Sequence, residues 1–482
     1  MDWWSVFQVD NENGIQDNTS CGICCLGADQ ILGILEKLPV LSILAFGMTC
    51  RRFRVLADSD ALWAHVCRQE WGNIAVDAWL NIGRNAKIGW KGLHRQMLAL
   101  NSITWQRLHQ GDFAPSPRAS HSMVSFSEKV TIFGGGYDGG RHLDDTWSAP
   151  LPKDFSNGIR WQQISIGIPG GRFAHSCTLV GNALVLFGGI NDHGTRQNDT
   201  WINKGLNVSN MEGQNLWQSL EVVESPSPRG AHAGCYAGDR KVVIYGGIQS
   251  DGIRLDDTWA LDLSERPLPT WCKVVTSCSP PARSGHTLTW VGGKQIILFG
   301  GRGTKFEVMN DVWLLDMETE SPEWVELRSG ELHAVRSCPA QRTGYNCPAA
   351  RAGHSSPAPR AGHSATLIFG GRILIYGGED SRRCRKGDVW LLDPMAGIPI
   401  GHGSSSVVVR NEAGGSKSGR RFWRKLKQWG DRPSKRSFHA ACTVHSGCGV
   451  LVFGGMIDGE LMPAAAGGLG FDAKLFLLQL TP

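Results

Sequence analysis

Histidine and cysteine are the residues of this chain whose spacing first suggests chemistry, because both bind metal ions. Six histidines occur in the motif Arg-x-x-His: His121, His175, His232, His286, His363 and His439. With one histidine in each repeated block, we expect them to lie too far apart to share one ion. The segment "CGICC" (Cys21, Cys24, Cys25) holds a Cys-x-x-Cys without a second half nearby, which favours loop thiols over zinc. We therefore predict no metal site.

The usual catalytic motifs are also missing. The chain has no His-Glu-x-x-His, no Gly-x-Ser-x-Gly and no phosphate-binding loop motif. The stretch "GRGTKF" (301–306) has Gly-x-Gly after a strand-like run, but another strand-like run follows it, so the dinucleotide interpretation fails. We predict no catalytic residue and no cofactor.

The elements that would position such residues form a repeat. Each Arg-x-x-His is followed by a short apolar run that ends in Gly-Gly, 16 to 18 residues after the arginine. In the first five blocks a tryptophan lies 13 residues after the first of these glycines: Trp147, Trp201, Trp259, Trp313 and Trp390. The runs are β-branched and aromatic, which is typical of strands buried on both faces. Gly-Gly supplies positive φ or a close backbone approach where each strand ends.

A second tryptophan strand completes each unit, at Trp105, Trp161, Trp217, Trp271, Trp324 and Trp423. Four short strands cannot bury both faces of one sheet, but radially stacked sheets can, so we predict an all-β six-bladed propeller over residues 103–482. Because Trp105 precedes the first Arg-x-x-His, "ITWQRL" is expected to complete the sixth blade that the C-terminus begins. The aspartates before the tryptophan strands are expected to accept backbone donors at the turn: Asp145, Asp257, Asp311 and Asp388.

Four segments depart from the repeat. In the sixth block Phe476 replaces the tryptophan. Insertions are expected near 329–359 and 394–420; the first doubles "RAGHS", and spacing selects the copy that begins at Arg360. The basic stretch 417–436 is open to three interpretations: a nuclear signal, a contact for an anionic partner, or a solvated edge strand.

The order Arg-x-x-His, Gly-Gly, Asp-x-Trp and Trp resembles the kelch repeat. In propellers of this class, the loops between the second and third strands share a face with the connections between blades. In this chain five such loops are expected, at residues 136–143, 190–197, 248–255, 302–310 and 379–387. They hold nine Lys or Arg against six Asp or Glu, with Arg141, Arg196 and Arg254 at nearly equivalent positions.

These loops suggest a basic face that binds an acidic or phosphorylated segment of a protein substrate. Ordinary solvated charge is an equally good interpretation. The candidate substrate-binding residues are Arg141, His142, His193, Arg196, Arg254, Arg302, Lys305, Arg382, Arg383 and Arg385.

Residues 28–72 have a different pattern, after an N-terminal segment 1–27 that we expect to be disordered or irregular. Apolar residues recur at helical spacings, and Pro39 ends one helix and opens the next, which predicts three short helices. Helices this short leave apolar surface that they cannot cover themselves, which suggests a partner. Residues 73–102 are predicted to be a mainly helical connector.

This segment resembles the plant form of the F-box, although the usual Leu-Pro that opens the first helix is absent. The resemblance implies docking on a Skp1-like adaptor. The positions that match are Leu35, Leu38, Pro39, Leu44, Met48, Cys50, Phe53, Leu56, Leu62 and Trp63. A plain three-helix cap on the propeller is the alternative.

The two resemblances together imply a non-catalytic adaptor. Its F-box would dock a Skp1-like protein, and through it a cullin and a RING protein, while the kelch propeller would hold a protein substrate for ubiquitination and degradation. An enzyme with a metal or radical cofactor in the central channel, and a kelch scaffold without a ligase role, are the alternatives. Because fewer than 30 residues precede the F-box, we expect no flavin-binding domain of the kind that some plant F-box/kelch proteins carry.

Composition limits the partners and the compartment. The net charge of +5 (49 basic minus 44 acidic residues) is explained by solubility alone, so no nucleic acid is expected. The N-terminus lacks the pattern of a secretory signal, and no apolar run approaches the length of a membrane span. The 14 cysteines are scattered. We expect an intracellular protein of the cytoplasm, the nucleus or both.

Overall fold

The computed structural model describes residues 22–71, 73, 76, 89–137, 140–204, 216–264, 268–318, 321–327, 356–396, 421–457 and 470–481. These residues form two compact units. One holds residues 22–71 and 89–95, and the other holds the remainder. The predicted irregular N-terminus up to residue 21, most of both insertions and the first "RAGHS" copy lie outside the described residues.

The first unit is helical: α1 (Ala28–Leu35), α2 (Val40–Gly47), α3 (Arg51–Ala57), α4 (Asp60–Trp71) and the start of α6 (Trp90–Leu98), after a short 3₁₀ turn η1 (Gly22–Cys25). Pro39 is the N-cap of α2, as its role in opening that helix predicts. The prediction of three helices within 28–72 was incomplete, because Leu62, Trp63 and Val66 belong to the separate helix α4. No helix among the described residues is long and apolar enough to span a membrane.

The second unit is a propeller of six blades. Their strands are listed in chain order within each blade. Blade 1 has β2 (Ser122–Phe126), β3 (Lys129–Phe133), β4 (Thr146–Pro150) and β5 (Gln162–Ser165). Blade 2 has β6 (Arg172–Phe173), β7 (Ser176–Val180), β8 (Ala183–Asn191), β9 (Arg196–Asn203) and β10 (Trp217–Ser219). Blade 3 has β11 (Ala233–Tyr236), β12 (Lys241–Tyr245), β13 (Thr258–Asp262) and β14 (Thr270–Val274).

The other three blades follow the same order. Blade 4 has β15 (Arg283–Ser284), β16 (Thr287–Gly292), β17 (Gln295–Gly303), β18 (Val308–Asp316) and β19 (Glu323–Leu327). Blade 5 has β20 (Ala361–Ile368), β21 (Arg372–Glu379), β22 (Val389–Leu392) and β23 (Trp423–Lys425). Blade 6 has β26 (Ala440–Val444), β27 (Gly449–Phe453) and β29 (Leu475–Thr481), with the short pair β25 (Arg436–Ser437) and β28 (Met456–Ile457) beside them.

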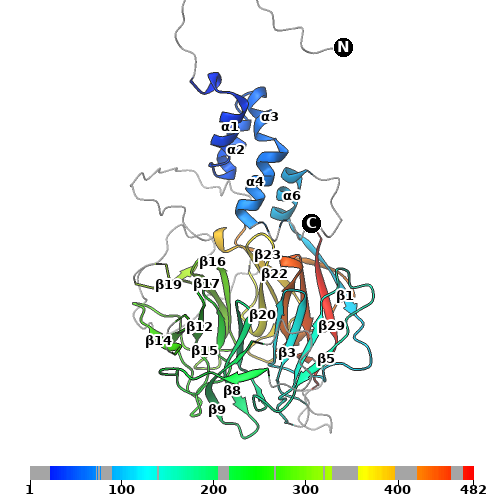
Figure 1. Ribbon diagram of the computed structural model, residues 1–482, viewed down its shortest axis with the longest axis vertical. Coiled ribbons are helices and arrows are strands. Elements are labelled where there is room, and N and C mark those ends of the chain that lie inside the picture. The colour runs from blue at the N-terminus through cyan, green and yellow to red at the C-terminus, as the bar shows by residue number, and fades with distance from the viewer. Residues whose placement is uncertain are drawn as a thin grey trace, which may run out of the picture. The chain divides into compact units, whose positions relative to one another are not determined.

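The ring closes through strand pairing between the two ends of the propeller sequence. β1 (Ser102–Leu108) pairs antiparallel with β29, so that Trp105 lies opposite Leu478 (Figure 1). The prediction that "ITWQRL" completes the sixth blade is confirmed. A further strand, β24 (Lys427–Gly430), pairs parallel with the outer side of β1 and places part of the basic stretch at a sheet edge.

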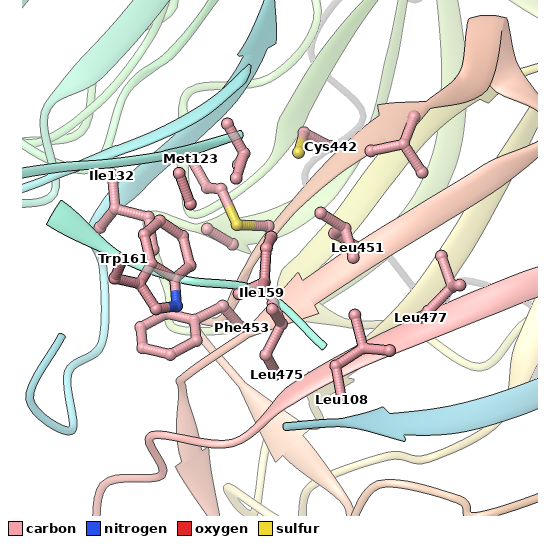
Figure 2. Close-up of a cluster of buried hydrophobic side chains, with 14 of the residues drawn as sticks. Leu108, Met123, Ile132, Ile159, Trp161, Cys442, Leu451, Phe453, Leu475 and Leu477 are labelled. Atoms are coloured by element: carbon pink, nitrogen blue, oxygen red, sulfur yellow. The ribbon is translucent and has the colours of Figure 1, made fainter. Parts of the chain in front are cut away.

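Apolar side chains join blade 6 to blade 1. Met123, Ile132 and Trp161 of blade 1 meet Phe453 and Leu475 of blade 6 in one buried cluster (Figure 2). Leu108 of β1 belongs to the same cluster, so the closing strand is held by side-chain packing as well as by its ladder. Burial of this kind is the main favourable term in holding neighbouring blades together.

In each blade, a buried arginine forms an ion pair with the aspartate that precedes the tryptophan, or in blade 6 the phenylalanine, of the third strand. In blade 1 the Arg118 guanidinium donates to both carboxylate oxygens of Asp145, at 2.7 and 2.8 Å, and the Trp147 indole donates to the same carboxylate at 2.6 Å. The same contact recurs at Asp199, Asp257, Asp311 and Asp388. The expectation of backbone donors at the turn missed these main partners, because the arginine lies 27 or 28 residues away in sequence.

The repeat histidines form a second inner layer that bridges neighbouring blades. Nε2 of His175, His232, His363 and His439 contacts a hydroxyl of the preceding blade, at 2.9 to 3.1 Å. That hydroxyl belongs to the residue after the preceding blade's own histidine. In blades 3 and 6 this residue is Ala233 or Ala440, and Nε2 of His286 and His121 has no partner among the described residues. Burial, and then the charge of Arg172, lowers the pKa of His175 to about 3, so the imidazole is neutral.

Candidate functional site

The helical unit exposes apolar side chains on its first three helices and on the turns between them. Met48 is 79% exposed and Leu41 is 58% exposed. We define the exposed apolar set as these two together with Ile34, Leu38, Leu44 and Val55. Apolar surface that gathers within one short segment, here residues 34–55, is typical of a binding surface.

The predicted adaptor-binding residues divide into exposed and buried groups. Leu38, Leu44 and Met48 belong to the exposed apolar set, and Pro39 and Cys50 are exposed beside them. Leu35, Phe53, Leu62 and Trp63 are buried in the core of the unit, and Leu56 is half-buried at its edge.

The buried group positions the helices that carry the exposed group. The Trp63 indole donates to the Ala57 carbonyl at 2.7 Å, which fastens the end of α3 to α4. Cys50 Sγ accepts from the Phe53 amide at 3.4 Å and caps the start of α3. Ile34, Leu41 and Val55 were not among the predicted residues, because apolar periodicity identifies a helix face without showing whether the domain itself covers it.

At one end of the propeller, six backbone hydrogen bonds form a closed ring, one from each blade to the next. The ring residues directly precede the repeat histidines: Ser120, Ala174, Ala231, Gly285, Gly362 and Phe438. Each amide donates to the carbonyl of the preceding blade's ring residue at 2.7 to 2.9 Å, and Ser120 closes the ring by donating to Phe438. All six have φ between 53° and 64°. We call this ring, which passes once through every blade, the channel mouth.

One side chain at this mouth is unusual. Phe438 is a bulky residue in the left-handed region, at φ 55°. A Cβ built on Gly362 would lie 2.7 Å from the Phe438 ring, so the aromatic ring lies against Gly362. Gly362 is buried for this reason, whereas the other five ring residues are half-buried. Phe438 is a component of the mouth that the sequence pattern did not reveal.

Around the ring lie the loops that join second and third strands. The residue after Gly-Gly in each blade bridges to a residue at the start of the third strand, and the bridges in blades 1, 2, 3 and 5 end at His142, Arg196, Arg254 and Arg385. These four positions are therefore equivalent. Arg141, which was predicted to be nearly equivalent to Arg196 and Arg254, comes one residue before the equivalent position at His142. In extended backbone, one residue places the side chain on the opposite face.

Hydrogen bonds and ring contacts hold several of these cations in place. Arg254 Nε donates to Ser284 Oγ at 3.1 Å, and its guanidinium lies 4.7 Å from the centre of the Phe306 ring. Arg302 forms a 2.9 Å ion pair with Glu379, whose other carboxylate oxygen accepts from Ser437 at 3.2 Å. These contacts link blades 3, 4, 5 and 6 across the mouth. Phe306 itself is 66% exposed in the left-handed region, and the sequence analysis did not single it out.

Comparisons with known proteins agree with both units. A model described as KLHDC2/KLHL20/DRC7 Kelch-repeats domain matches residues 90–277, 174–347 and 269–398, and an F-box-like model matches residues 29–69. The chain is 42% identical to "F-box/kelch-repeat protein At1g51550" of Arabidopsis thaliana over 475 residues, which cover 96% of this chain and 93% of that protein. The chain belongs to the F-box/kelch-repeat family.

More distant F-box/kelch relatives are longer than this chain. It is 28% identical to "Adagio-like protein 1" of Oryza sativa subsp. japonica and 28% identical to "Adagio protein 3" of Arabidopsis thaliana. Each match covers 90% of this chain and 62% of the relative. Both predicted resemblances, to the F-box and to the kelch repeat, are confirmed.

The remaining predicted substrate-binding residues of the F-box/kelch chain lie farther out on the loops. Arg141, Lys305 and Arg382 are exposed. Arg383 has φ 60° in a turn whose amides donate to Asp380. His193 lines a hollow of about 240 Å³ with Gly170, Gly171, Arg172, Asn191, Asp192 and Gln197. In the part of the chain that the structure describes, no three His, Cys, Asp or Glu side chains are grouped to hold a metal ion.

Proposed function

We propose that this protein is the substrate-recognition adaptor of an SCF-type ubiquitin ligase. The helical unit docks a Skp1-like protein and, through it, a cullin and a RING protein, and the propeller holds the protein to be ubiquitinated and degraded. The observation that carries the proposal is the exposed apolar set, because it lies within the segment that matches the F-box-like model. Such an adaptor works in the cytoplasm or the nucleus.

In this role the protein makes and breaks no bonds itself. It holds the target near the ligase and so raises the effective concentration of one with respect to the other. The apolar set supplies the burial that drives docking, and Leu41 and Met48 are the most exposed of its members on α2 and directly after it. The buried residues Leu35, Phe53, Leu62 and Trp63 act by holding these helices in register.

The proposed docking of the helical unit is tested with a purified Skp1-like protein. Replacing Leu41 and Met48 by serine removes two exposed apolar anchors without opening the core, and we expect binding about 100-fold weaker by titration calorimetry. Val275→Ser is the matched control, because Val275 is an 81% exposed apolar residue of the propeller. Unchanged adaptor binding in the double variant, or no complex with the native chain, would favour the scaffold function instead.

The proposal that the propeller binds the target protein depends on the cationic side chains around the channel mouth. We propose that Arg196 and Arg254, with His142 and Arg302, contact an acidic segment of the target, and that Arg382 and Arg383 extend this basic surface outward. Arg385 has the equivalent backbone position but is buried, at 4% exposure, and is not part of this surface. The equivalent backbone positions of Arg196 and Arg254 in neighbouring blades support this interpretation. The Arg302–Glu379 pair reduces the net charge there.

Charge reversal tests the proposed binding of the target protein. Glutamate at Arg196, Arg254 and Arg383 together is expected to abolish co-purification of ubiquitination targets from cells in which the proteasome is blocked. Glutamate at Lys153, Lys204 and Lys273 is the matched control, because these lysines are exposed and lie in other loops and in an outer strand. Equal capture by both triple variants would mean that the mouth arginines are ordinary solvated charge.

A further inference from the structure

Blade 6 departs from the framework of the other five at its third strand. Phe476 lies opposite Val452, in the same register as Trp147 opposite Ile132 in blade 1. Asp472 comes four residues before Phe476, whereas the aspartates of the other blades come two residues before their tryptophan. Blade 6 therefore has a smaller aromatic ring and two additional residues, and Lys474 lies within this lengthened segment.

The departure changes what the framework arginine contacts. Arg436 donates to Asp472 at 2.7 Å and to the Gly454 carbonyl at 2.8 Å, and its guanidinium lies 5.2 Å from the centre of the Phe476 ring. The phenylalanine side chain has no N–H, so it cannot donate a hydrogen bond to the aspartate as the tryptophan indoles of the other five blades do. The Asp472 oxygen Oδ1 accepts instead from the Lys474 amide at 3.0 Å, which fixes the backbone that carries the Lys474 side chain.

Beside Phe476 there is a hollow of about 550 Å³. Its lining residues are Arg107, Asp431, Arg432, Ser434, Lys474 and Phe476. Arg107 lies directly opposite Phe476 in the β1–β29 ladder, and Arg432 is held by a hydrogen bond to the Gln428 carbonyl. Three cations and one carboxylate give the lining a net charge of +2, which favours a dianion over a singly charged carboxylate.

We propose that this hollow is a binding site for a phosphate monoester. Arg107, Arg432 and Lys474 supply the positive charge, the Ser434 hydroxyl can donate a further hydrogen bond, and the volume admits the phosphate together with the residue that bears it. The segment Asp431–Ser434 leads into the Arg-x-x-His of blade 6, so the site lies at the end of the blade where the channel mouth is formed. A phosphorylated side chain of a bound protein and free phosphate are two sources of the same ligand chemistry. Assigning the ligand to a phosphorylated protein depends on the proposed role of the propeller in substrate binding, whereas assigning it to free phosphate does not.

The site itself is tested with inorganic phosphate and the full chain. Saturable broadening of the phosphate ³¹P resonance is expected with the native protein at constant ionic strength. Phe476→Trp fills the hollow with the residue that the other five blades carry, and Lys474→Gln removes one cation; each is expected to weaken binding about tenfold or more. Lys427→Gln is the matched control, because Lys427 is an exposed lysine of β24 that does not line the hollow, and it should change binding less than about twofold.

A second titration separates the two sources. A short acidic peptide with one phosphoserine is compared with its unphosphorylated form on the native chain and on Phe476→Trp. Preference for the phosphopeptide that is lost in Phe476→Trp supports a phosphoprotein ligand. Phosphate binding without peptide preference assigns the site to the free anion and overturns the phosphoprotein interpretation. If the native chain shows no saturable phosphate binding, or if neither variant weakens it, the site is overturned, while binding of a Skp1-like protein to the same samples remains a separate test of the adaptor role.

Discussion

Met48 in the helical unit is an apolar side chain with 79% exposure, whereas Arg283 in the propeller is a charged side chain with none. The two regions thus reverse the usual placement of polar and apolar groups. The propeller can bury its arginines because each has a carboxylate and backbone carbonyls as fixed partners. Among the described residues, no side chains cover the exposed apolar set in the same way.

The contrast shows where function is built in each region. In the propeller, buried charge is satisfied within each blade and supports stability and shape, and the proposed recognition residues lie in the loops. In the helical unit, the core is small, and the proposed docking surface is the apolar set that the fold leaves exposed. The two regions should therefore respond differently to substitution, to pH and to an added partner.

The largest expected effect is the loss of one framework carboxylate. Asp311→Ala leaves Arg283 buried without its ion-pair partner and removes the acceptor of the Trp313 indole. We expect the free energy of unfolding of the propeller to fall by about 3–5 kcal/mol, measured by urea unfolding with tryptophan fluorescence. Asp239→Ala, at an exposed ion pair with Lys294, is the control and should change stability by less than about 1 kcal/mol. A small effect at Asp311 would contradict the framework role.

Acid should weaken the propeller before it weakens the helical unit. Burial, followed by the charge of a neighbouring arginine, lowers the pKa of His175, His232 and His363 to about 3. The unfolded chain takes up these protons near pH 6.5 and the folded chain does not, so the stability is present above pH 6.5 and is lost as the pH falls. Each histidine should contribute about 1.4 kcal/mol per pH unit of this loss.

Urea unfolding at pH 7.5, 6.5 and 5.5 measures this slope. His175→Gln should reduce the slope by the equivalent of about one proton, because the chain then takes up one proton fewer on unfolding. At pH values below those at which the histidines of the unfolded chain titrate, protonation of the aspartates also lowers the stability of the propeller. Burial raises the pKa of Asp257, but the hydrogen bond and charge of Arg229 outweigh it and hold that pKa below its usual value. A slope that is flat between pH 6.5 and 5.5 would contradict the neutral buried histidines.

Much of the propeller could be predicted from sequence because its repeat has fixed spacing. Blade number, strand order and closure by Trp105 all follow from six copies of one pattern. The Arg–Asp contact was missed because no local rule links residues 27 or 28 positions apart. The sequence repeat shows that the arginine and the aspartate both recur in each block, but only the folded structure shows that they contact each other.

The sites were less predictable, since they depend on features that differ between blades. Arg141 was predicted to be nearly equivalent to Arg196, but the register places His142 there, because loop spacing does not fix strand register. Phe438 and Phe306 were not singled out, as left-handed backbone at a bulky residue cannot be inferred from its type. In the helical unit, Ile34, Leu41 and Val55 differ from the buried apolar residues only in which face the neighbouring helices cover.

A smaller, stabilising effect is expected where the histidine layer lacks a hydroxyl. Ala440→Ser places a hydroxyl at the position that holds a serine or threonine in four other blades, next to the unpartnered Nε2 of His121. We expect stability to rise by about 0.5–1.5 kcal/mol in urea unfolding. Ala441→Ser, one residue along the strand and on its other face, should not stabilise. Equal changes in the two variants would show that the hydroxyl does not reach His121.

The smallest expected effect on stability is at Met48, where the two regions differ most. Because Met48 is largely exposed, Met48→Ser should change the free energy of unfolding of the helical unit by no more than about 0.5 kcal/mol. Leu62→Ala, in the core of the same unit, should cost about 2–5 kcal/mol. In a titration with a Skp1-like protein, however, Met48→Ser alone should weaken binding by about tenfold or more, because the lost contact forms only in the complex. If Met48→Ser destabilised the free protein as much as Leu62→Ala does, Met48 would be part of the fold rather than of a binding surface, and the contrast between the two regions would fail at the residue that defines it.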